Sequence, residues 1–252
     1  MRREALELDR FYRSRQGLVA REMIGRRLAA IWPDVKDLDL LGLGFATPYL
    51  DAYRDSARRC VCFMPATQGA VVASTACSGI ALGDETHLPF PDALFDRVLL
   101  VHALEEADSL QASLREIWRV LAPEGRVVIV TAARSGIWAW LDSTPFGHGR
   151  PFSRAQLSQL LDDALFEPTA WSRALFAPPW KWSTNTRIAR MWEDAGERAW
   201  PALGGVIMVE AVKRTMALRP RRATAPVRGK PLEAGARPAL SRQDTPPDLS
   251  DS

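Results

Sequence analysis

The stretch from residue 83 to residue 130 has the clearest pattern of apolar and polar positions in the chain. Residues 98–101 (VLLV) form the short apolar run that a parallel strand covered on both faces requires. The next apolar residues recur at helical spacing, and they are Leu110, Leu114, Ile117, Trp118 and Leu121. Pro123 and Gly125 then end the helix, and residues 126–130 resume a strand pattern. The pattern predicts one complete βαβ unit.

The same reading predicts further elements on either side of this unit. Residues 38–41 read as a buried strand that runs into a Gly42-x-Gly44 turn and a helix, and residues 59–64 read as a second strand. The third strand falls at residues 71–74 or at residues 79–82, and residues 204–212 form a last strand. One or two helices precede Trp32, with a break near Gln16-Gly17. This alternation predicts an α/β sheet.

Three consecutive segments resemble a known family. The run LPFPDALFDRV, the helix and turn LREIWRVLAPEGR, and the strand after it are similar to the second half of a class I S-adenosylmethionine-dependent methyltransferase of the type 11 kind. The resemblance covers residues 38–131. It implies a Rossmann-like, seven-stranded, mostly parallel sheet flanked by helices, with strand order 3-2-1-4-5-7-6, and S-adenosyl-L-methionine as the cofactor.

The resemblance also implies which residues hold the cofactor, beginning with the first βα turn. Gly42, Leu43 and Gly44 take the place of the family's glycine-rich loop, which brings backbone N–H groups close to a ligand. The chain departs from that loop twice, because Leu40 replaces the acid and Ala46 replaces the third glycine. These departures put the affinity for the cofactor in doubt.

The second and third strands carry the expected contacts to adenosine. Met64 stands where the family has an acid for the ribose hydroxyls, and a thioether is at best a weak acceptor. The loss of such a hydrogen bond costs about 1.5 to 3 kcal/mol. Gln68 is near enough in the sequence to substitute. Asp84, with the backbone of Glu85, is expected to bind the adenine amino group, and the alternative is an ordinary loop acid.

The residues after the fourth and fifth strands are the candidates for chemistry, since ligands of such sheets gather beyond the carboxyl ends of the strands. Val101 and His102 are expected to contact the cofactor, and His102 is also a candidate general base or a structural histidine. His148 is the second candidate base. Arg134 and Arg150 would bind an acidic group or tie down loop carbonyls. We expect no metal site.

Composition narrows the classes of partner. The net charge of +3 comes from the end of the chain, because residues 1–212 hold 24 basic and 26 acidic side chains. No nucleic-acid partner is therefore predicted. No apolar run approaches the roughly 20 residues of a membrane helix. Cys60, Cys62 and Cys77 give an odd count without a C-x-x-C pair, which favours core packing and a reducing, cytoplasmic location.

These observations lead to one assignment of domains and function. Residues 1–33 are an N-terminal helical segment, residues 34–215 a methyltransferase-like domain, and residues 216–252 a basic, proline-rich tail expected to be disordered. The function implied by the resemblance is methyl transfer to a small-molecule acceptor. The alternative is an inactive relative that serves as a binding or regulatory protein. The residues do not indicate the acceptor or the oligomeric state.

Overall fold

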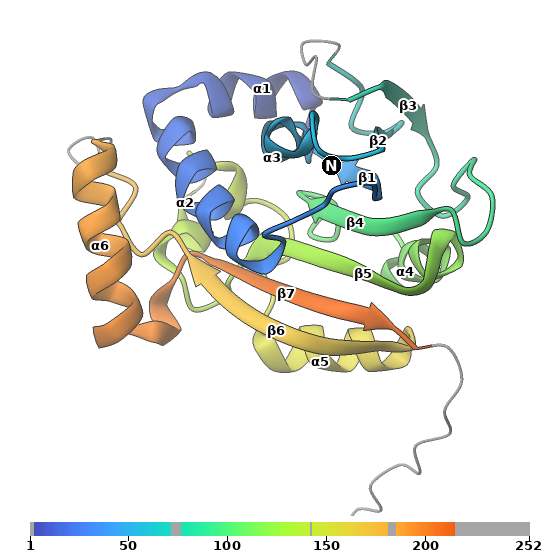
Figure 1. Cartoon of the computed structure of the whole chain (residues 1–252). Coiled ribbons are helices and arrows are strands. Elements are labelled where there is room, and N and C mark those ends of the chain that lie inside the picture. Colours follow the sequence, from blue (N-terminus) through green and yellow to red (C-terminus); the bar gives the residue numbers. More distant parts are fainter. Residues whose placement is uncertain (1–2, 72–76, 142, 181–184, 215–252) are drawn as a thin grey trace, which may run out of the picture. The chain divides into compact units, whose positions relative to one another are not determined.

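A computed structural model describes residues 3–71, 77–141, 143–180 and 185–214 of the chain (Figure 1). The chain divides into a compact unit, Met1–Met216, and a segment, Ala217–Ser252. The predicted tail at residues 216–252 lies outside the described residues. None of the helices in the described part is both long and apolar enough to cross a membrane.

The centre of the unit is a seven-stranded sheet in the order β3-β2-β1-β4-β5-β7-β6, which confirms the predicted order. All neighbours pair in parallel except β7, which is antiparallel to both β5 and β6. The strands are β1 (Asp39–Gly44), β2 (Arg59–Pro65), β3 (Gly79–Gly83), β4 (Phe95–Val101), β5 (Leu121–Ala132), β6 (Phe166–Ala174) and β7 (Val206–Lys213).

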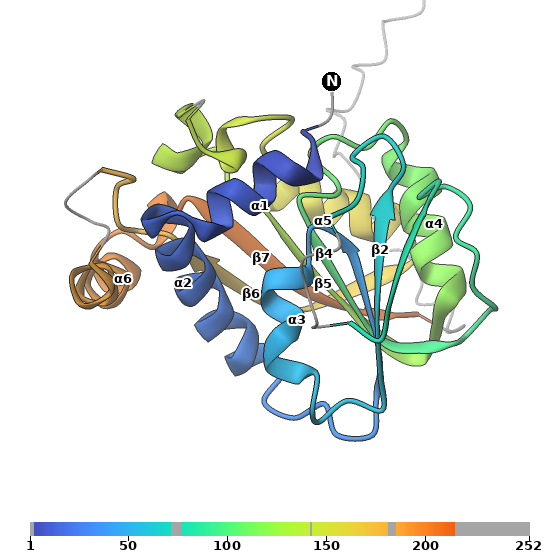
Figure 2. The same ribbon diagram turned by 90° about the horizontal axis from the view of Figure 1, so that it is seen from above.

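Helices cover both faces of this sheet (Figures 1 and 2). The helices are α1 (Ala5–Arg13), α2 (Arg15–Ile31), α3 (Thr47–Leu50), α4 (Leu110–Val120), α5 (Arg154–Asp163) and α6 (Thr186–Ala199). Short 3-10 turns are η1 (Asp51–Tyr53), η2 (Ile137–Trp140), η3 (Pro145–Gly147) and η5 (Pro201–Leu203). Residues of α1, α2, α3 and α6 share one hydrophobic core, and residues of α4 and α5 share the other.

The two cores follow from the alternation of side chains along each strand. In β1, Leu40 belongs to the core under α1 to α3, whereas Leu41 and Leu43 belong to the core under α4 and α5. All six residues of β1 are buried, as a central parallel strand requires. The sheet is thus the middle of three layers.

Several helices begin at a serine whose side chain caps the first turn. The Ser153 side chain accepts the Gln156 N–H while the Gln156 side chain accepts the Ser153 N–H, which forms a capping box on α5. Ser109 caps α4 in the same way through the Ala112 N–H. Ser14 caps α2 by accepting the Gly17 N–H, so the break between the first two helices lies at Ser14.

The structure corrects or completes other expectations. The third strand is β3, the second of the two predicted alternatives, and residues 72–76 lie outside the described part. The helix after β1 is only one turn, α3, continued by η1. Segment β6, which the sequence pattern did not predict as a strand, forms the sheet edge. Cys60 and Cys62 both lie in the core as predicted, but Cys62 is joined to Cys77, with 6.0 Å between the Cα atoms.

Candidate functional site

The candidate site is the crevice beyond the carboxyl ends of β1 and β4. Strand β1 pairs with β2 on one side and with β4 on the other, so the strand order reverses direction there. In open α/β sheets this switch point is where ligands bind. Two of the predicted site residues lie here. Gly44 is the last residue of β1, and His102 directly follows β4.

The Gly42-x-Gly44 turn packs tightly against protein groups. Gly44 has φ of 77°, and a Cβ added there would lie 2.4 Å from the Val101 carbonyl oxygen. The Phe45 N–H donates to that same carbonyl at 2.8 Å. A Cβ at Gly42 would lie 2.4 Å from the Cδ1 atom of Leu50 in α3. The two glycines therefore allow the turn to approach β4 and α3 closely.

The two positions that lack the expected acids are fully buried. Leu40 and Met64 each expose 0% of their surface and lie in the core under α1 to α3. Gln68 is also buried, its Nε2 atom lies 3.5 Å from the His102 carbonyl oxygen, and its Oε1 atom has no hydrogen-bond partner among the described residues. Its backbone carbonyl accepts the Ala5 N–H at 2.8 Å, which ties the start of α1 to this loop.

Helix α1 lies over the crevice (Figure 2). The Tyr12 ring stacks on Phe45 of the turn, with 5.6 Å between centroids and 18° between planes. The Tyr12 hydroxyl lies 2.9 Å from Nε2 of His102 and accepts a hydrogen bond from the Tyr49 hydroxyl at 3.0 Å. Ala5, Leu8 and Tyr12 are buried on this side of α1. The helix thus fills the crevice with its own side chains.

His102 is held in this aromatic cluster. It exposes 7% of its surface, has φ of 49°, and its ring centroid lies 4.8 Å from that of Phe146. Burial, followed by the positive charge of Arg3, lowers the pKa of His102 to about 3. The imidazole is therefore neutral near pH 7 and is a weak proton acceptor in this arrangement.

The second predicted base, His148, lies at the same end of the crevice. Its ring nitrogens lie 2.9 and 2.8 Å from Nη2 of Arg3, and the Arg3 N–H donates to the Glu106 carboxylate at 2.7 Å. His102 and His148 both line a cavity of about 10 Å³. Such a cavity holds one water molecule at most.

Glu105 is a buried carboxylate at this end of the crevice that the sequence analysis did not single out. It exposes 4% of its surface, and its Oε1 atom accepts the Ala132 N–H at 3.2 Å. Burial raises the pKa of Glu105 to about 7. Its backbone carbonyl accepts the Arg150 N–H, and the Arg150 guanidinium donates to the Ala107 carbonyl, so Arg150 ties down loop carbonyls. Glu105 lies several residues before α4, and its side chain contacts Ala132 at the end of β5.

Asp84 and Glu85 directly follow β3, so they lie on the side of the sheet where the parallel strands have their carboxyl ends. The Asp84 carboxylate accepts the Thr86 N–H at 2.8 Å and the Thr86 hydroxyl at 2.7 Å. These two hydrogen bonds hold the pKa of Asp84 below its usual range. Asp84 is 62% exposed at its side chain, whereas Glu85 is buried. Asp84 thus caps its own turn.

A nucleoside-sized cofactor needs open space beside the glycine turn. Small-molecule sites usually enclose about 300 to 1,000 Å³. The cavity lined by Leu8, His102 and Glu105 has about 10 Å³, which is well below this range. Tyr12 stacks on Phe45 and contacts His102, so a cofactor at the glycine turn would require α1 to move.

Comparisons with known proteins agree with the sheet order. Residues 38–129 match the family model of a methyltransferase domain. A demethylmenaquinone methyltransferase from Symbiobacterium thermophilum is 40% identical over 55 residues, which is 22% of each chain. The ubiquinone/menaquinone biosynthesis C-methyltransferase UbiE from Cupriavidus pinatubonensis is 35% identical over 63 residues, 25% of each chain. The matches span about a fifth to a quarter of the length of these curated relatives.

Solved structures share the fold over most of the chain. The [4+2]-cyclase SpnF has a TM-score of 0.57 and 21% identity, with 77% of this chain and 80% of that chain covered. A possible histamine N-methyltransferase from Thermotoga maritima has a TM-score of 0.55 and 18% identity, with 82% and 95% covered. The sheet order and these solved structures show that the chain has the fold of class I S-adenosylmethionine-dependent methyltransferases, and residues 38–129 match a methyltransferase domain.

Proposed function

We propose that the protein is an S-adenosylmethionine-dependent methyltransferase that acts on a small-molecule acceptor. The observation that carries this proposal is the position of the Gly42-x-Gly44 turn, at the switch point between β1 and β4 and within the matched methyltransferase domain. Asp84 follows β3 on the same edge, where it can contribute to adenosine binding. The names of the curated relatives support methyl transfer as the reaction class.

The proposal requires α1 to leave the crevice, and the structure indicates where it would turn. Helices α1 and α2 meet at Ser14, the extended residue between them. A Cβ at Gly17 would lie 1.9 Å from the carbonyl oxygen of Phe11, so glycine is needed for this close corner. The corner holds Tyr12 against Phe45 and His102. Movement about Ser14 would withdraw these side chains together.

Gly17→Ala therefore tests the proposal, because the added methyl group forces the end of α1 away from the crevice. Calorimetry with S-adenosylhomocysteine should show binding that is about tenfold tighter in this variant than in the natural chain, since less of the protein is closed. Gly25→Ala is the matched control. It lies on the same helix with no atom within 4 Å of the added Cβ, and it should leave the affinity unchanged.

Tyr12→Ala is a second route to the same test, because it empties the crevice without altering the corner. If neither variant nor the natural chain binds S-adenosylhomocysteine at millimolar concentration, while circular dichroism shows that all are folded, the methyltransferase proposal is wrong.

A second function is favoured by the filled crevice together with Leu40 and Met64. These observations support an inactive methyltransferase relative that acts as a binding or regulatory protein. An inactive relative should show no affinity for S-adenosylhomocysteine in any of the variants above. The same titrations therefore separate the two functions.

A further inference from the structure

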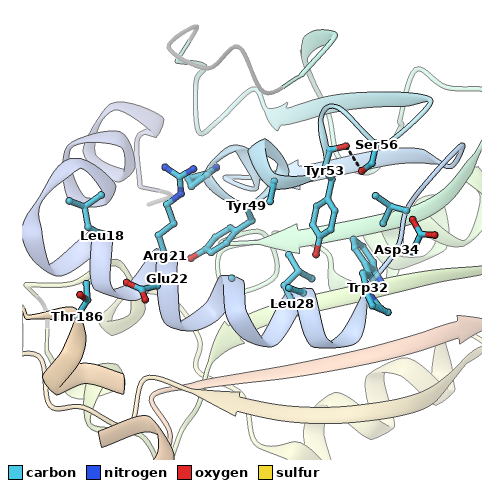
Figure 3. Close-up of a pocket in the computed structure, with 16 residues that line it drawn as sticks. Leu18, Arg21, Glu22, Leu28, Trp32, Asp34, Tyr49, Tyr53, Ser56 and Thr186 are labelled. Atoms are coloured by element: carbon cyan, nitrogen blue, oxygen red, sulfur yellow. Dashed lines mark hydrogen bonds between the residues drawn. The ribbon is translucent and has the colours of Figure 1, made fainter. Parts of the chain in front are cut away.

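We propose that the groove between α2 and the α3–η1 segment is a binding site for a neutral, planar, apolar molecule that carries a carbonyl oxygen. The groove has a volume of about 750 Å³ and is lined by residues that include Leu18, Arg21, Leu28, Trp32, Tyr49 and Tyr53 (Figure 3). This volume is within the range of small-molecule sites. The site is separate from the crevice, and it does not depend on methyl transfer.

The groove exists because the helix after β1 is short and the facing side chains are small. Segment α3 with η1 spans only residues 47–53, and it contributes Pro48 and Ala52 to one wall. Ala29 of α2 lies on the opposite wall. Among the residues that the structure describes, these wall positions carry only small side chains.

The floor of the groove selects a planar, apolar ligand. Leu28, Trp32 and Tyr53 are buried, and the ring centroids of Trp32 and Tyr53 lie 6.2 Å apart at 64°. Aromatic side chains in this arrangement offer large faces and edges to a second ring system. The Trp32 Nε1–H already donates to Glu210 at 3.2 Å, so it is not available to a ligand.

One polar group on the floor lacks a partner. Tyr53 exposes 7% of its surface, and its hydroxyl points toward Leu28 and Trp32 of α2 (Figure 3). Among the residues that the structure describes, no group forms a hydrogen bond with this hydroxyl. The hydroxyl oxygen itself is not fully buried, so it is a donor that is open to the groove, and a ligand carbonyl there would accept its hydrogen bond in place of water. Burial also raises the pKa of Tyr53 to about 12, so the hydroxyl remains a donor.

The charged groups at the rim favour a neutral ligand. Arg21 is paired with Asp51 at 2.9 Å, and Glu22 is paired with Arg190 of α6. Asp34 is exposed and its carboxylate accepts the Lys36 N–H. The cations at the rim are thus engaged, and Asp34 disfavours an anion. An acidic ligand would find no free positive charge among these groups.

The neutral naphthalene ketone Prodan is a suitable probe, because its emission shifts to the blue in apolar surroundings. The natural chain should bind one Prodan molecule saturably. Ala29→Phe and Ala52→Phe, which fill the groove from opposite walls, should each weaken binding about tenfold or more. Ala30→Phe adds the same side chain on an exposed, neighbouring position of α2 that does not line the groove, and it should leave binding unchanged.

The hydroxyl is tested with Tyr53→Phe and a second dye. Loss of one neutral hydrogen bond should weaken Prodan binding about three- to tenfold. Dimethylaminonaphthalene, which lacks the ketone, should bind equally to both forms. Unsaturable Prodan binding, equal effects at Ala29 and Ala30, or the same effect of Tyr53→Phe on both dyes would overturn the proposal. A dimer in sedimentation that Ala29→Phe dissociates would assign the groove to a second copy instead.

Discussion

The crevice at the carboxyl ends of β1 and β4 and the groove between α2 and α3–η1 lie on the same side of the sheet and share one residue, yet one is filled and the other is open. In the crevice, Tyr12 of α1 packs on Phe45 and His102, and the cavity beside it that Leu8 lines has only about 10 Å³. The groove has about 750 Å³, and small residues such as Ala29, Pro48 and Ala52 face one another across it. Tyr49 lines the groove while its hydroxyl donates to Tyr12 in the crevice.

The difference shows that a motif shared with a family does not determine whether the space beside it is open to a ligand. The crevice has the glycine turn and the strand order of the family, but its space depends on a helix that lies outside the matched residues 38–129. The groove has the space, but no motif marks it. Each region can therefore be altered without the other, and the following predictions test this separation, starting with the largest expected effect.

Gly44→Ala should lower the free energy of unfolding by about 3 to 4 kcal/mol. The added Cβ would lie 2.4 Å from the Val101 carbonyl oxygen, at a φ of 77° that alanine rarely adopts. Urea unfolding measures the loss. Gly69→Ala is the control, because Gly69 has φ of 75° but no atom within 4 Å of its added Cβ, and it should cost about 1 kcal/mol. Equal losses would mean that the turn does not pack on β4 as described.

Glu105→Gln should change how stability depends on pH. Burial raises the folded-state pKa of Glu105 to about 7 from an ordinary value of 4.5. Its contribution to stability is therefore fully present below pH 4.5 and is lost as the pH rises through 7. Between pH 5 and pH 8 the variant should gain about 2 kcal/mol relative to the natural chain.

Comparing the Glu105→Gln variant with the natural chain removes the contribution of His102 to the pH dependence of stability. That contribution has the opposite sign to the contribution of Glu105. The pKa of His102 is lowered to about 3, so its contribution is present above pH 6.5 and is lost as the pH falls. Since His102 is present in both proteins, its effect cancels in the difference. A difference between the two unfolding free energies that is the same at pH 5 and pH 8 would show that Glu105 is not buried in this crevice.

Tyr49→Phe should have the smallest effect, a loss of about 1 kcal/mol, because it removes one buried hydrogen bond to Tyr12. Tyr53→Phe is its matched control in the same groove. The Tyr53 hydroxyl has no partner among the described residues, so its removal should cost no stability. Thermal unfolding of both variants measures the difference. A larger loss for Tyr53→Phe would contradict the hydrogen bonding described for both regions.

Local patterns were enough to predict most of the sheet. Residues 98–101 and the helical stripe that follows them correspond to β4 and α4, because a buried parallel strand and an amphipathic helix each leave a regular pattern in the sequence. The strand order itself came from the family resemblance. Strand β6 was missed, since its burial is only partial along the edge of the sheet and no strict alternation marks it.

The candidate site was predictable only as a list of positions. The sequence placed Gly44, Asp84 and His102 at or after the ends of their strands. In the structure all three lie on the side of the sheet where the parallel strands have their carboxyl ends. The sequence pattern predicted the N-terminal helices but did not place Tyr12 in the crevice, because that contact joins residues far apart in the chain. Glu105 offered no local signal of its burial, because a carboxylate before a helix reads the same whether it is exposed or buried.

The sequence by itself determined the α/β class, the glycine turn and the absence of acids at Leu40 and Met64, because these depend on residue type and local spacing. Only the tertiary structure decided that Tyr12 occupies the crevice and that the α2 groove stays open. Both depend on contacts between residues far apart in the chain, such as Tyr12 with His102 and Trp32 with Tyr53. The volume left between packed elements is set by all of their side chains together, so no single stretch of sequence specifies it.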